Sequence, residues 1–344
     1  MDNIIWVKGE DIGVLGRPFP NARPYCRLED RDIELMEKVH YAGMSFHPRC
    51  SSGMHIDFET DTENLYVKWE VVHAFFRSDV PISCESCIDC YTMDGNRWRY
   101  LSTAFVDNIS KKTECLLYSA GEFPNLPRGR KSFSINLPTY DFVLSLEIGV
   151  DKGSFIKGIK PKNEKPVAVY GTSITQGGHA SRPGLIWPTQ VRRMIGRELV
   201  NLGFSGSGRL EPEMTDILCR LDPAVMVMDC VANMRDGSLD EFTQRWIYFY
   251  KKFRETHSHT PLLIIEQPTF ANDWAKFRGL EPMNRELRKL VKKWQENDRN
   301  IEYIKTNLLY TPDGEGTVDG IHGTDASFQR MSRIISRKLK DMLK

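Results

Sequence analysis

The chain has 344 residues, of which 40% are hydrophobic and 27% charged, so it can bury a sizeable core and lacks the composition of a disordered chain. Its 47 Lys and Arg and 46 Asp and Glu leave a net charge of +1, which argues against a nucleic-acid partner because there is no basic surplus for a polyanion. No run approaches the roughly 18 apolar residues that a membrane span needs.

The beginning of the chain carries little information about compartment. Residues 1–13 lack the charged and then apolar layout of a secretory signal. Two alternatives therefore stay open, a cytoplasmic protein or an exported one whose signal has been removed. A length of 344 residues favours about two domains.

The first half of the chain predicts short strands. Several segments between residues 40 and 150 alternate apolar and polar side chains and are separated by turn signals such as Asp94-Gly95-Asn96. The expected strands are 54–60, 65–72, 98–106, 114–120, 131–138 and 142–150. This pattern is typical of two packed antiparallel sheets, so residues 1–160 are expected to form an all-β, jelly-roll-like sandwich domain. The charged, proline-bearing stretch 157–166 is interpreted as the domain link.

The second half predicts a parallel sheet with helices on both faces. Apolar runs of strand length now alternate with longer amphipathic stretches. The expected strands are 166–170, 198–204, 224–230, 261–267 and 301–306, and the expected helices are 184–197, 211–220, 239–256, 281–296 and a last one from about 325. Strands alternating with helices are typical of an α/β fold, so residues 161–344 are expected to form an α/β domain.

Three of the eight cysteines, Cys84, Cys87 and Cys90, have the spacing of half a zinc site or of a redox pair. A structural zinc site usually draws ligands from a second paired cluster, and the sequence has no clear one. We therefore interpret these cysteines as ordinary strand or loop residues and expect no metal and no cofactor.

A serine follows the first strand of the expected parallel sheet. Ligands of such sheets bind at the carboxyl ends of the strands. There, Gly171-Thr172-Ser173 would let the backbone turn sharply and expose the Ser173 hydroxyl. A hydroxyl needs a base within hydrogen-bond reach to act as a nucleophile. Alone, Ser173 could equally cap the following helix.

Three further loops carry groups that could complete such a site. The segment 201–208 is glycine-rich, so its N–H groups could approach a ligand closely. Asn233 stands just beyond the strand 224–230, although Asn is also a common turn residue. Asp319 and His322, three residues apart before the last helix, could supply an orienting carboxylate and a base.

Taken in order, these four loops resemble the blocks of the SGNH (GDSL-like) hydrolase superfamily. The resemblance implies a flavodoxin-like sheet and the roles of nucleophile for Ser173, and of orienter and base for Asp319 and His322. It also implies an oxyanion hole formed by Ser173, Gly206 and Asn233. Gly206 is preferred over Gly203 and Gly208 only on the register of one Ser-Gly pair.

A narrower resemblance is to bacterial two-domain SGNH members with a β-rich leading domain. The phrases GTSITQGG (171–178), ASRPG (180–184) and NLGFSGSGRLEPE (201–213) carry it. The G-x-D-L-Y element of that group reads Cys-Ile-Asp-Cys-Tyr at 87–91 and departs from the pattern at the glycine and the leucine. The resemblance implies hydrolysis of acyl esters, most plausibly O-acetyl groups of carbohydrates, without metal or cofactor.

Other readings stay open at this point. His179 is a rival base close to Ser173, but we interpret it as a pocket residue, and Arg182, Trp187 and Glu266 are further candidates for substrate binding. The expected partner is a small-molecule or carbohydrate ester, and the oligomeric state is not predicted. The alternatives are a non-catalytic carbohydrate-binding protein on the same scaffold and a lysophospholipase or thioesterase.

Overall fold

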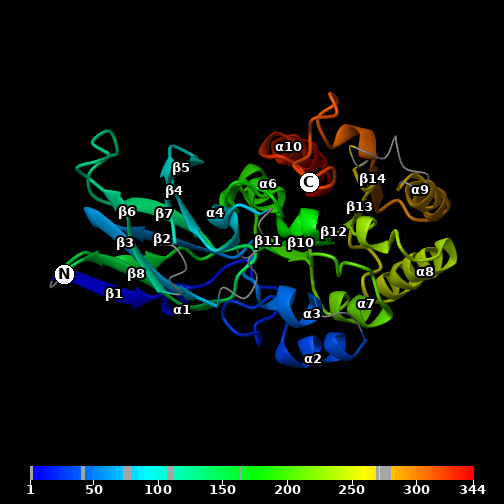
Figure 1. Ribbon diagram of the computed structural model, residues 1–344, viewed down its shortest axis with the longest axis horizontal. Coiled ribbons are helices and arrows are strands. Elements are labelled where there is room, and N and C mark those ends of the chain that lie inside the picture. Colours follow the sequence, from blue (N-terminus) through cyan, green and yellow to red (C-terminus); the bar gives the residue numbers. More distant parts are fainter. Residues whose placement is uncertain are drawn as a thin grey trace.

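The protein has an antiparallel β part and an α/β part, which lie at opposite ends of the molecule in Figure 1. The computed structural model describes residues 3–39, 43–72, 80–106, 112–162, 164–268, 271 and 280–344. Among these residues no helix is long and apolar enough to cross a membrane.

The α/β part is built on a five-stranded parallel sheet. Its strands are β10 (Val167–Gly171), β11 (Leu199–Gly203), β12 (Val225–Asp229), β13 (Leu262–Ile265) and β14 (Ile301–Ile304). Their spatial order is β11-β10-β12-β13-β14, and all neighbouring pairs are parallel. Numbered along the chain this is the order 2-1-3-4-5, which confirms the predicted flavodoxin-like sheet.

Helices cover both faces of this sheet, as predicted. They are α5 (Ser173–Gln176), α6 (Trp187–Ile195), α7 (Pro212–Leu218), α8 (Leu239–Thr256), α9 (Glu281–Gln295) and α10 (Asp325–Met342). Alternate residues of β10 face opposite sides, so Ala168 and Tyr170 pack with α7, α8 and α9, whereas Val167 and Val169 pack with α6 and α10. Short 3₁₀ turns are η1 (His47–Arg49), η2 (Pro183–Leu185), η3 (Ala232–Met234) and η5 (Thr306–Leu308).

The N-terminal part contains two antiparallel sheets, in the orders β1-β8-β3-β6 and β5-β4-β7-β2-β9. The strands are β1 (Ile4–Lys8), β2 (His55–Thr60), β3 (Asn64–Val71), β4 (Ile88–Asp94), β5 (Arg97–Ala104), β6 (Lys112–Ser119), β7 (Lys131–Asn136), β8 (Val143–Asp151) and β9 (Ile156–Gly158). Buried side chains of both sheets, among them Trp69 and Phe133, form one shared core, which confirms the predicted sandwich. The prediction missed β1, β4 and β9.

Helices of the N-terminal half pack into the α/β core. The described residues 3–50 form α1 (Gly9–Ile12), α2 (Asp30–Val39) and α3 (Gly43–Phe46), and α4 (Ile82–Glu85) follows later. Ile33 and Met36 of α2 are fully buried among the residues of α7, α8 and α9, and Met44 of α3 belongs to the same cluster. The expected division near residue 160 stays a prediction, but α2 and α3 pack with the α/β part.

A buried arginine joins the same N-terminal segment to the edge of the parallel sheet. Arg27 Nη1 donates to the carbonyl oxygens of Asn201 and Gly203 on edge strand β11, at 3.3 and 2.6 Å. Burial lowers the pKa of Arg27 to about 10. The guanidinium therefore donates to carbonyl groups on the outer side of an edge strand, which have no neighbouring strand to supply a donor.

Candidate active site

Ser173 lies at a sharp turn between β10 and α5. The turn requires glycine at its start, because a Cβ on Gly171 would lie 2.0 Å from Thr175 Oγ1 and 2.7 Å from the Asp229 carbonyl oxygen. Thr172 then caps α5, with its Oγ1 accepting from the Ile174 N–H at 3.3 Å. The serine is thus the first residue of a helix, where backbone N–H groups have no intrahelical partner.

The structure brings Ser173, His322 and Asp319 together in one chain of hydrogen bonds. The Ser173 Oγ lies 2.7 Å from His322 Nε2, and His322 Nδ1 lies 2.7 Å from Asp319 Oδ2. Ser173 and His322 are each 8% exposed. A hydroxyl and an imidazole held this close can exchange a proton directly.

Asp319 is held as a carboxylate. Its Oδ1 accepts from the backbone N–H groups of Ile321 and His322 at 2.9 and 2.8 Å. Burial by itself would raise the pKa of Asp319, but the hydrogen bonds from the His322 ring and from these two N–H groups hold it well below its usual range. The charge on Asp319 therefore favours the tautomer of His322 with its proton on Nδ1.

The glycine-rich loop after β11 contains one glycine that differs from its neighbours. Gly203 and Gly208 pack against backbone, since an added Cβ would meet Gln176 N at 2.3 Å and Gly171 O at 2.1 Å. Gly206 instead has a φ of 68° and open space where its Cβ would be. Its N–H has no hydrogen-bond partner among the described residues, so it is available to a ligand.

Asn233 lies next to this loop on η3. Its Oδ1 accepts from the Gly208 N–H at 3.2 Å. This bond orients the side-chain amide and leaves its NH₂ group to donate elsewhere, because an amide oxygen that accepts fixes which end is the donor.

His179 packs against His322. The two imidazole rings are stacked, with centroids 4.3 Å apart and an interplanar angle of 19°. His179 Nε2 is also 3.7 Å from Asp319 Oδ2, the same oxygen that His322 contacts. His179 adopts a φ of 71°, a region that non-glycine residues rarely occupy. It therefore borders the hydrogen-bonded pair of Ser173 and His322 and does not replace His322 beside Ser173.

Three other expected binding residues are engaged by protein groups. Arg182 Nη1 donates to Asp89 Oδ2 at 2.8 Å and to the Tyr91 hydroxyl at 2.6 Å. Trp187 is fully buried in the core shared with α10, and the buried Glu266 accepts from the Thr306 N–H at 3.0 Å and pairs with Arg288. These contacts are structural, and the full burial of Trp187 is incompatible with direct contact to a substrate.

Asp89 and Tyr91 belong to the element in which the sequence departs from G-x-D-L-Y. Besides binding Arg182, Asp89 accepts from the Gly184 N–H at 2.8 Å and is fully buried. The element thus ties β4 to the loop that follows His179. The departing residues, Cys87 and Cys90, are buried in the sandwich core.

Two residues near Ser173 were not predicted from the sequence. The Tyr140 hydroxyl, from the β part, donates to the Ser173 carbonyl oxygen at 3.3 Å. Asp229, at the end of β12, is fully buried and accepts from Thr175 Oγ1 at 2.7 Å. Burial raises the pKa of Asp229 to about 7, although the bond from Thr175 opposes the shift. The position of Asp229 at a strand end was the one signal that could have singled it out.

Among the residues that the structure describes, two groups of side chains have the spacing of metal ligands, within 4.8 Å of one another. One is His179, Asp319 and His322, whose last two members are already hydrogen-bonded to each other. The other is His55, Asp57 and Glu198, where Arg192 Nη1 lies 3.0 Å from Asp57 Oδ2 and supplies a positive charge. Hydrogen bonds or ion pairs account for both groups.

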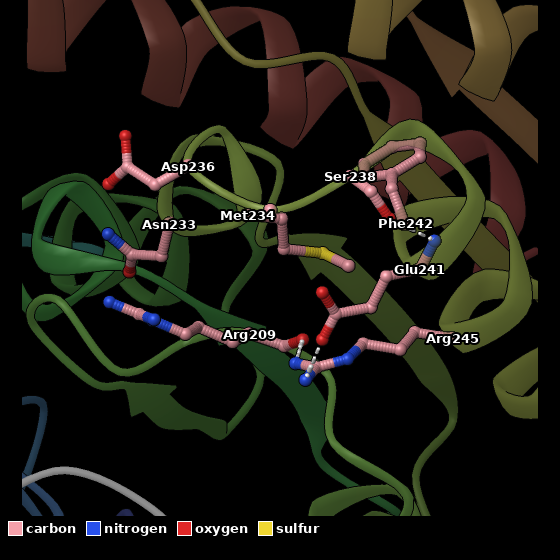
Figure 2. Close-up of a pocket in the computed structure, with 9 residues that line it drawn as sticks. Arg209, Asn233, Met234, Asp236, Ser238, Glu241, Phe242 and Arg245 are labelled. Carbon is pink, nitrogen blue, oxygen red and sulfur yellow. Dashed lines mark hydrogen bonds and ion pairs between the residues drawn. The ribbon is translucent and has the colours of Figure 1, made fainter.

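A polar cavity adjoins Asn233, as Figure 2 shows. It has a volume of about 260 Å³ and is lined by Arg209, Asn233, Met234, Asp236, Gly237, Ser238, Glu241, Phe242 and Arg245. Arg245 pairs with Glu241 at 2.5 Å and donates to the Arg209 carbonyl oxygen at 2.8 Å. The cavity wall therefore combines charged and hydrogen-bonding groups with apolar surface, to which Met234 and Phe242 contribute.

Comparison with known proteins gives two family matches. Residues 164–340 match the GDSL-like lipase/acylhydrolase family, and residues 4–156 match a family described as the N-terminus of SGNH hydrolase-type esterases. No curated protein matches the chain.

Solved structures resemble the whole chain. A protein described as a GDSL-like lipase from Bacteroides ovatus has a TM-score of 0.88 at 28% identity, with 99% of this chain and 98% of that chain covered. The salicylyl-acyltransferase SsfX3 of a tetracycline biosynthetic pathway has a TM-score of 0.78 at 18% identity, with 98% and 97% covered. A family two carbohydrate esterase from Clostridium thermocellum, in complex with cellohexaose, has a TM-score of 0.60 at 14% identity, with 85% and 93% covered. The last two likenesses concern the fold.

Proposed function

The chain belongs to the GDSL-like lipase/acylhydrolase family and is an ester hydrolase, and from this premise we propose that it is a serine esterase that removes acetyl groups from carbohydrate hydroxyls. Ser173 is the proposed nucleophile, His322 the base and Asp319 its orienting partner. The observation that carries the proposal is the pair of 2.7 Å contacts, from Ser173 Oγ to His322 Nε2 and from His322 Nδ1 to Asp319 Oδ2.

In the acylation step, Ser173 Oγ attacks the ester carbonyl carbon while His322 Nε2 takes the hydroxyl proton. The ionised Asp319 stabilises the imidazolium that forms and keeps its ring in place. His322 then gives the proton to the leaving sugar oxygen, so the C–O bond breaks and an acetyl-serine ester remains. Water, deprotonated by His322, attacks this ester; the bond to Ser173 Oγ then breaks, His322 returns the proton to Ser173 Oγ, and acetate is released.

The negative charge of the tetrahedral intermediate needs donors aimed at the oxyanion. The N–H groups of Ser173 and Gly206 and the NH₂ group of Asn233 are the proposed donors. Support comes from the unoccupied Gly206 N–H and from the bond between Gly208 and the Asn233 oxygen, which turns the NH₂ outward. In well-studied enzymes one such donor contributes about 3 to 4 kcal/mol to transition-state binding.

The cavity beside Asn233 supports a hydroxylated alcohol. Arg209, Glu241 and Arg245 line it with groups that can form hydrogen bonds with sugar hydroxyls. The carbohydrate esterase of the same fold, which binds cellohexaose, supports the same choice.

The first test is turnover of a chromogenic acetyl ester by the purified protein and by Ser173→Ala. We expect turnover and labelling by a serine-directed fluorophosphonate in the wild type and loss of both in the variant. Ser205→Ala, in the neighbouring glycine-rich loop, is the matched control and should keep both. Full turnover by Ser173→Ala would refute the nucleophile assignment, and an inactive but glycan-binding wild type would favour the non-catalytic alternative.

The second test ranks substrates. Acetylated xylan and acetylated monosaccharides should be hydrolysed faster than long-chain acyl esters or lysophospholipids at equal concentration. Preference for the long chains would instead identify a lipase or a lysophospholipase of the same fold.

A further inference from the structure

A basic cavity lies on the flank of the molecule, between the β4–β5 hairpin, α6 and α10. Its volume is about 660 Å³, and its lining is Asn96, Arg97, Trp98, Gln190, Arg193, Met194, Arg333, Ser336, Arg337 and Lys340. Figure 1 shows α6 and α10 side by side above the parallel sheet. We propose that this cavity is a second binding site, which holds a carboxylate-bearing polysaccharide chain.

The cavity concentrates positive charge without compensation. Five of its lining residues are cationic and none is acidic. Within the described part of the chain, no ion pair is formed by Arg97, Arg333, Arg337 or Lys340. The nearest acids along the chain, Asp94 and Asp341, are paired with Arg99 and Lys344 at 2.6 and 2.7 Å.

This local charge is notable because the whole chain carries only +1. Like charges gathered around one hollow repel one another and raise the local concentration of anions. An anionic ligand removes the repulsion, whereas a neutral one does not.

The cations are arranged in a row that suits a chain with repeated negative charges. Arg333, Arg337 and Lys340 lie on one face of α10, and the helical rise separates them by about 6 and about 4 Å along the axis. Arg193 approaches the row from α6, where its Nη2 donates to the Gly184 carbonyl oxygen at 2.5 Å and its guanidinium stacks over the Tyr91 ring. Guanidinium groups bind carboxylates through paired, parallel hydrogen bonds.

Trp98 gives the cavity an apolar surface. Its side chain is half-buried and also lines an adjoining cavity of about 280 Å³, whose wall contains both basic and acidic residues, among them Lys160 and Glu164. A single half-buried indole can cover one sugar ring, whereas non-specific binders of single-stranded nucleic acid stack successive bases on several aromatic rings. The choice of a polysaccharide therefore follows from Trp98 and rests on the proposed carbohydrate esterase function.

The cavity is separate from the candidate active site. Along α10, Arg333 lies about 12 Å and Lys340 about 22 Å beyond Asp325, the helix residue closest in sequence to His322. An acidic glycan bound here would hold the substrate on the enzyme while its acetylated residues reach Ser173.

The test compares binding with small-ester turnover in the full-length protein. Binding is measured by affinity electrophoresis and calorimetry with polygalacturonate, a soluble neutral β-glucan and a single-stranded oligonucleotide. The variant Arg333→Gln/Arg337→Gln removes two cavity cations. Lys289→Gln/Lys338→Gln, whose lysines lie outside the cavity and are paired with Glu286 and Glu302, is the charge-matched control.

We expect polygalacturonate to bind the wild type and to weaken as salt is added. The Arg variant should lose about tenfold in affinity, the Lys control less than about twofold, and both should hydrolyse a small chromogenic acetyl ester like the wild type. Unchanged polygalacturonate affinity in the Arg variant, equal binding of the neutral glucan, or binding of the oligonucleotide alone would each overturn the proposal.

Failure of the esterase proposal is distinguishable from failure of this site. If the wild type binds polygalacturonate through the two arginines but does not hydrolyse any ester, the binding site stands and the proposed catalytic function falls.

Discussion

Asp319 is the side chain on which the charge balance around Ser173 depends. It contacts the His322 ring and two backbone N–H groups, and it is also near His179. One carboxylate thus faces two stacked imidazoles.

The variant Asp319→Asn should be almost inactive although it folds. An amide in this place can donate to His322 Nδ1 and so favours the wrong tautomer, in which Nε2 cannot accept the Ser173 proton. In a comparable triad this change lowers kcat by about 10⁴-fold. Steady-state kinetics should show a large loss in kcat with little change in KM, while Asp313→Asn, at an exposed carboxylate nearby, should behave like the wild type. Near-normal kcat in Asp319→Asn would show that Asp319 does not orient the base.

The burial of Asp229 lowers the unfolding free energy of the protein when this carboxyl group is ionised. It is fully buried behind Ser173, and its Oδ1 has no hydrogen-bond partner among the described residues. The pKa of about 7 means that the folded protein keeps a proton on Asp229 at pH values where the unfolded chain, with a pKa near 3.8, has lost it. Stability should therefore fall as pH rises from about 4 to about 7 and then level off.

The variant Asp229→Asn should remove this pH dependence. It has nearly the same shape but no charge, so it should be more stable than the wild type above pH 7, by up to about 4 kcal/mol. The advantage should shrink at pH 5. Chemical denaturation of the wild type and of Asp229→Asn at pH 5 and at pH 8 measures the difference in unfolding free energy at each pH. Asp222→Asn, at an exposed carboxylate, is the control. An advantage that is equal at the two pH values would contradict the assigned pKa shift.

At the scale of elements, β4 joins the sandwich to the hydrolase part. Asp89 contacts Arg182 and the Gly184 N–H, and both partners lie in the loop between His179 and α6. The Tyr140 hydroxyl reaches the Ser173 carbonyl from the same half of the chain. The sandwich therefore forms a wall against which the active-site loops are held.

Asp89→Ala should destabilise the protein by about 3 kcal/mol, because it removes the carboxylate partner of Arg182 and leaves the buried Gly184 N–H without its acceptor. Urea unfolding measures the loss. Asp94→Ala removes an exposed carboxylate from the same strand and should cost less than about 1 kcal/mol. Similar losses in the two variants would mean that the contact between β4 and the loop contributes little.

At the scale of the whole molecule, a segment of the N-terminal half completes a core of the α/β half. α2 precedes the first strand of the larger sandwich sheet in the chain, yet Ile33 is fully buried among residues of α7, α8 and α9. Unfolding of the N-terminal half should therefore expose apolar surface of the α/β half.

Ile33→Ala tests this coupling. Removal of the buried side chain should lower the unfolding free energy by about 3 kcal/mol and shift one common transition seen by probes in both halves. Leu35→Ala, at a residue of the same helix that is 41% exposed, should change the unfolding free energy only slightly. A separate transition of one half alone would show that the halves unfold independently.

Much of the fold could be predicted from local pattern. Alternating segments indicated the sandwich, and strands alternating with amphipathic helices indicated the parallel sheet, because hydrophobic periodicity reports which faces are buried. The loops that carry the candidate site were selected because they follow strand ends, where the fold places ligands. The resemblance to the SGNH superfamily then gave the roles of Ser173, Gly206, Asn233, Asp319 and His322.

Other features were decided by tertiary structure, because they depend on contacts between distant segments. Periodicity could not reveal that Trp187 is core, that Arg182 serves Asp89, or that Asp229 is buried with a raised pKa. Nor could it show that the arginines of α10 and a tryptophan of the sandwich line one cavity. The sequence by itself determined which residue types follow each strand, whereas the packing of distant segments decided which of these side chains contact one another. The burial and the charge state of each side chain depend on those contacts.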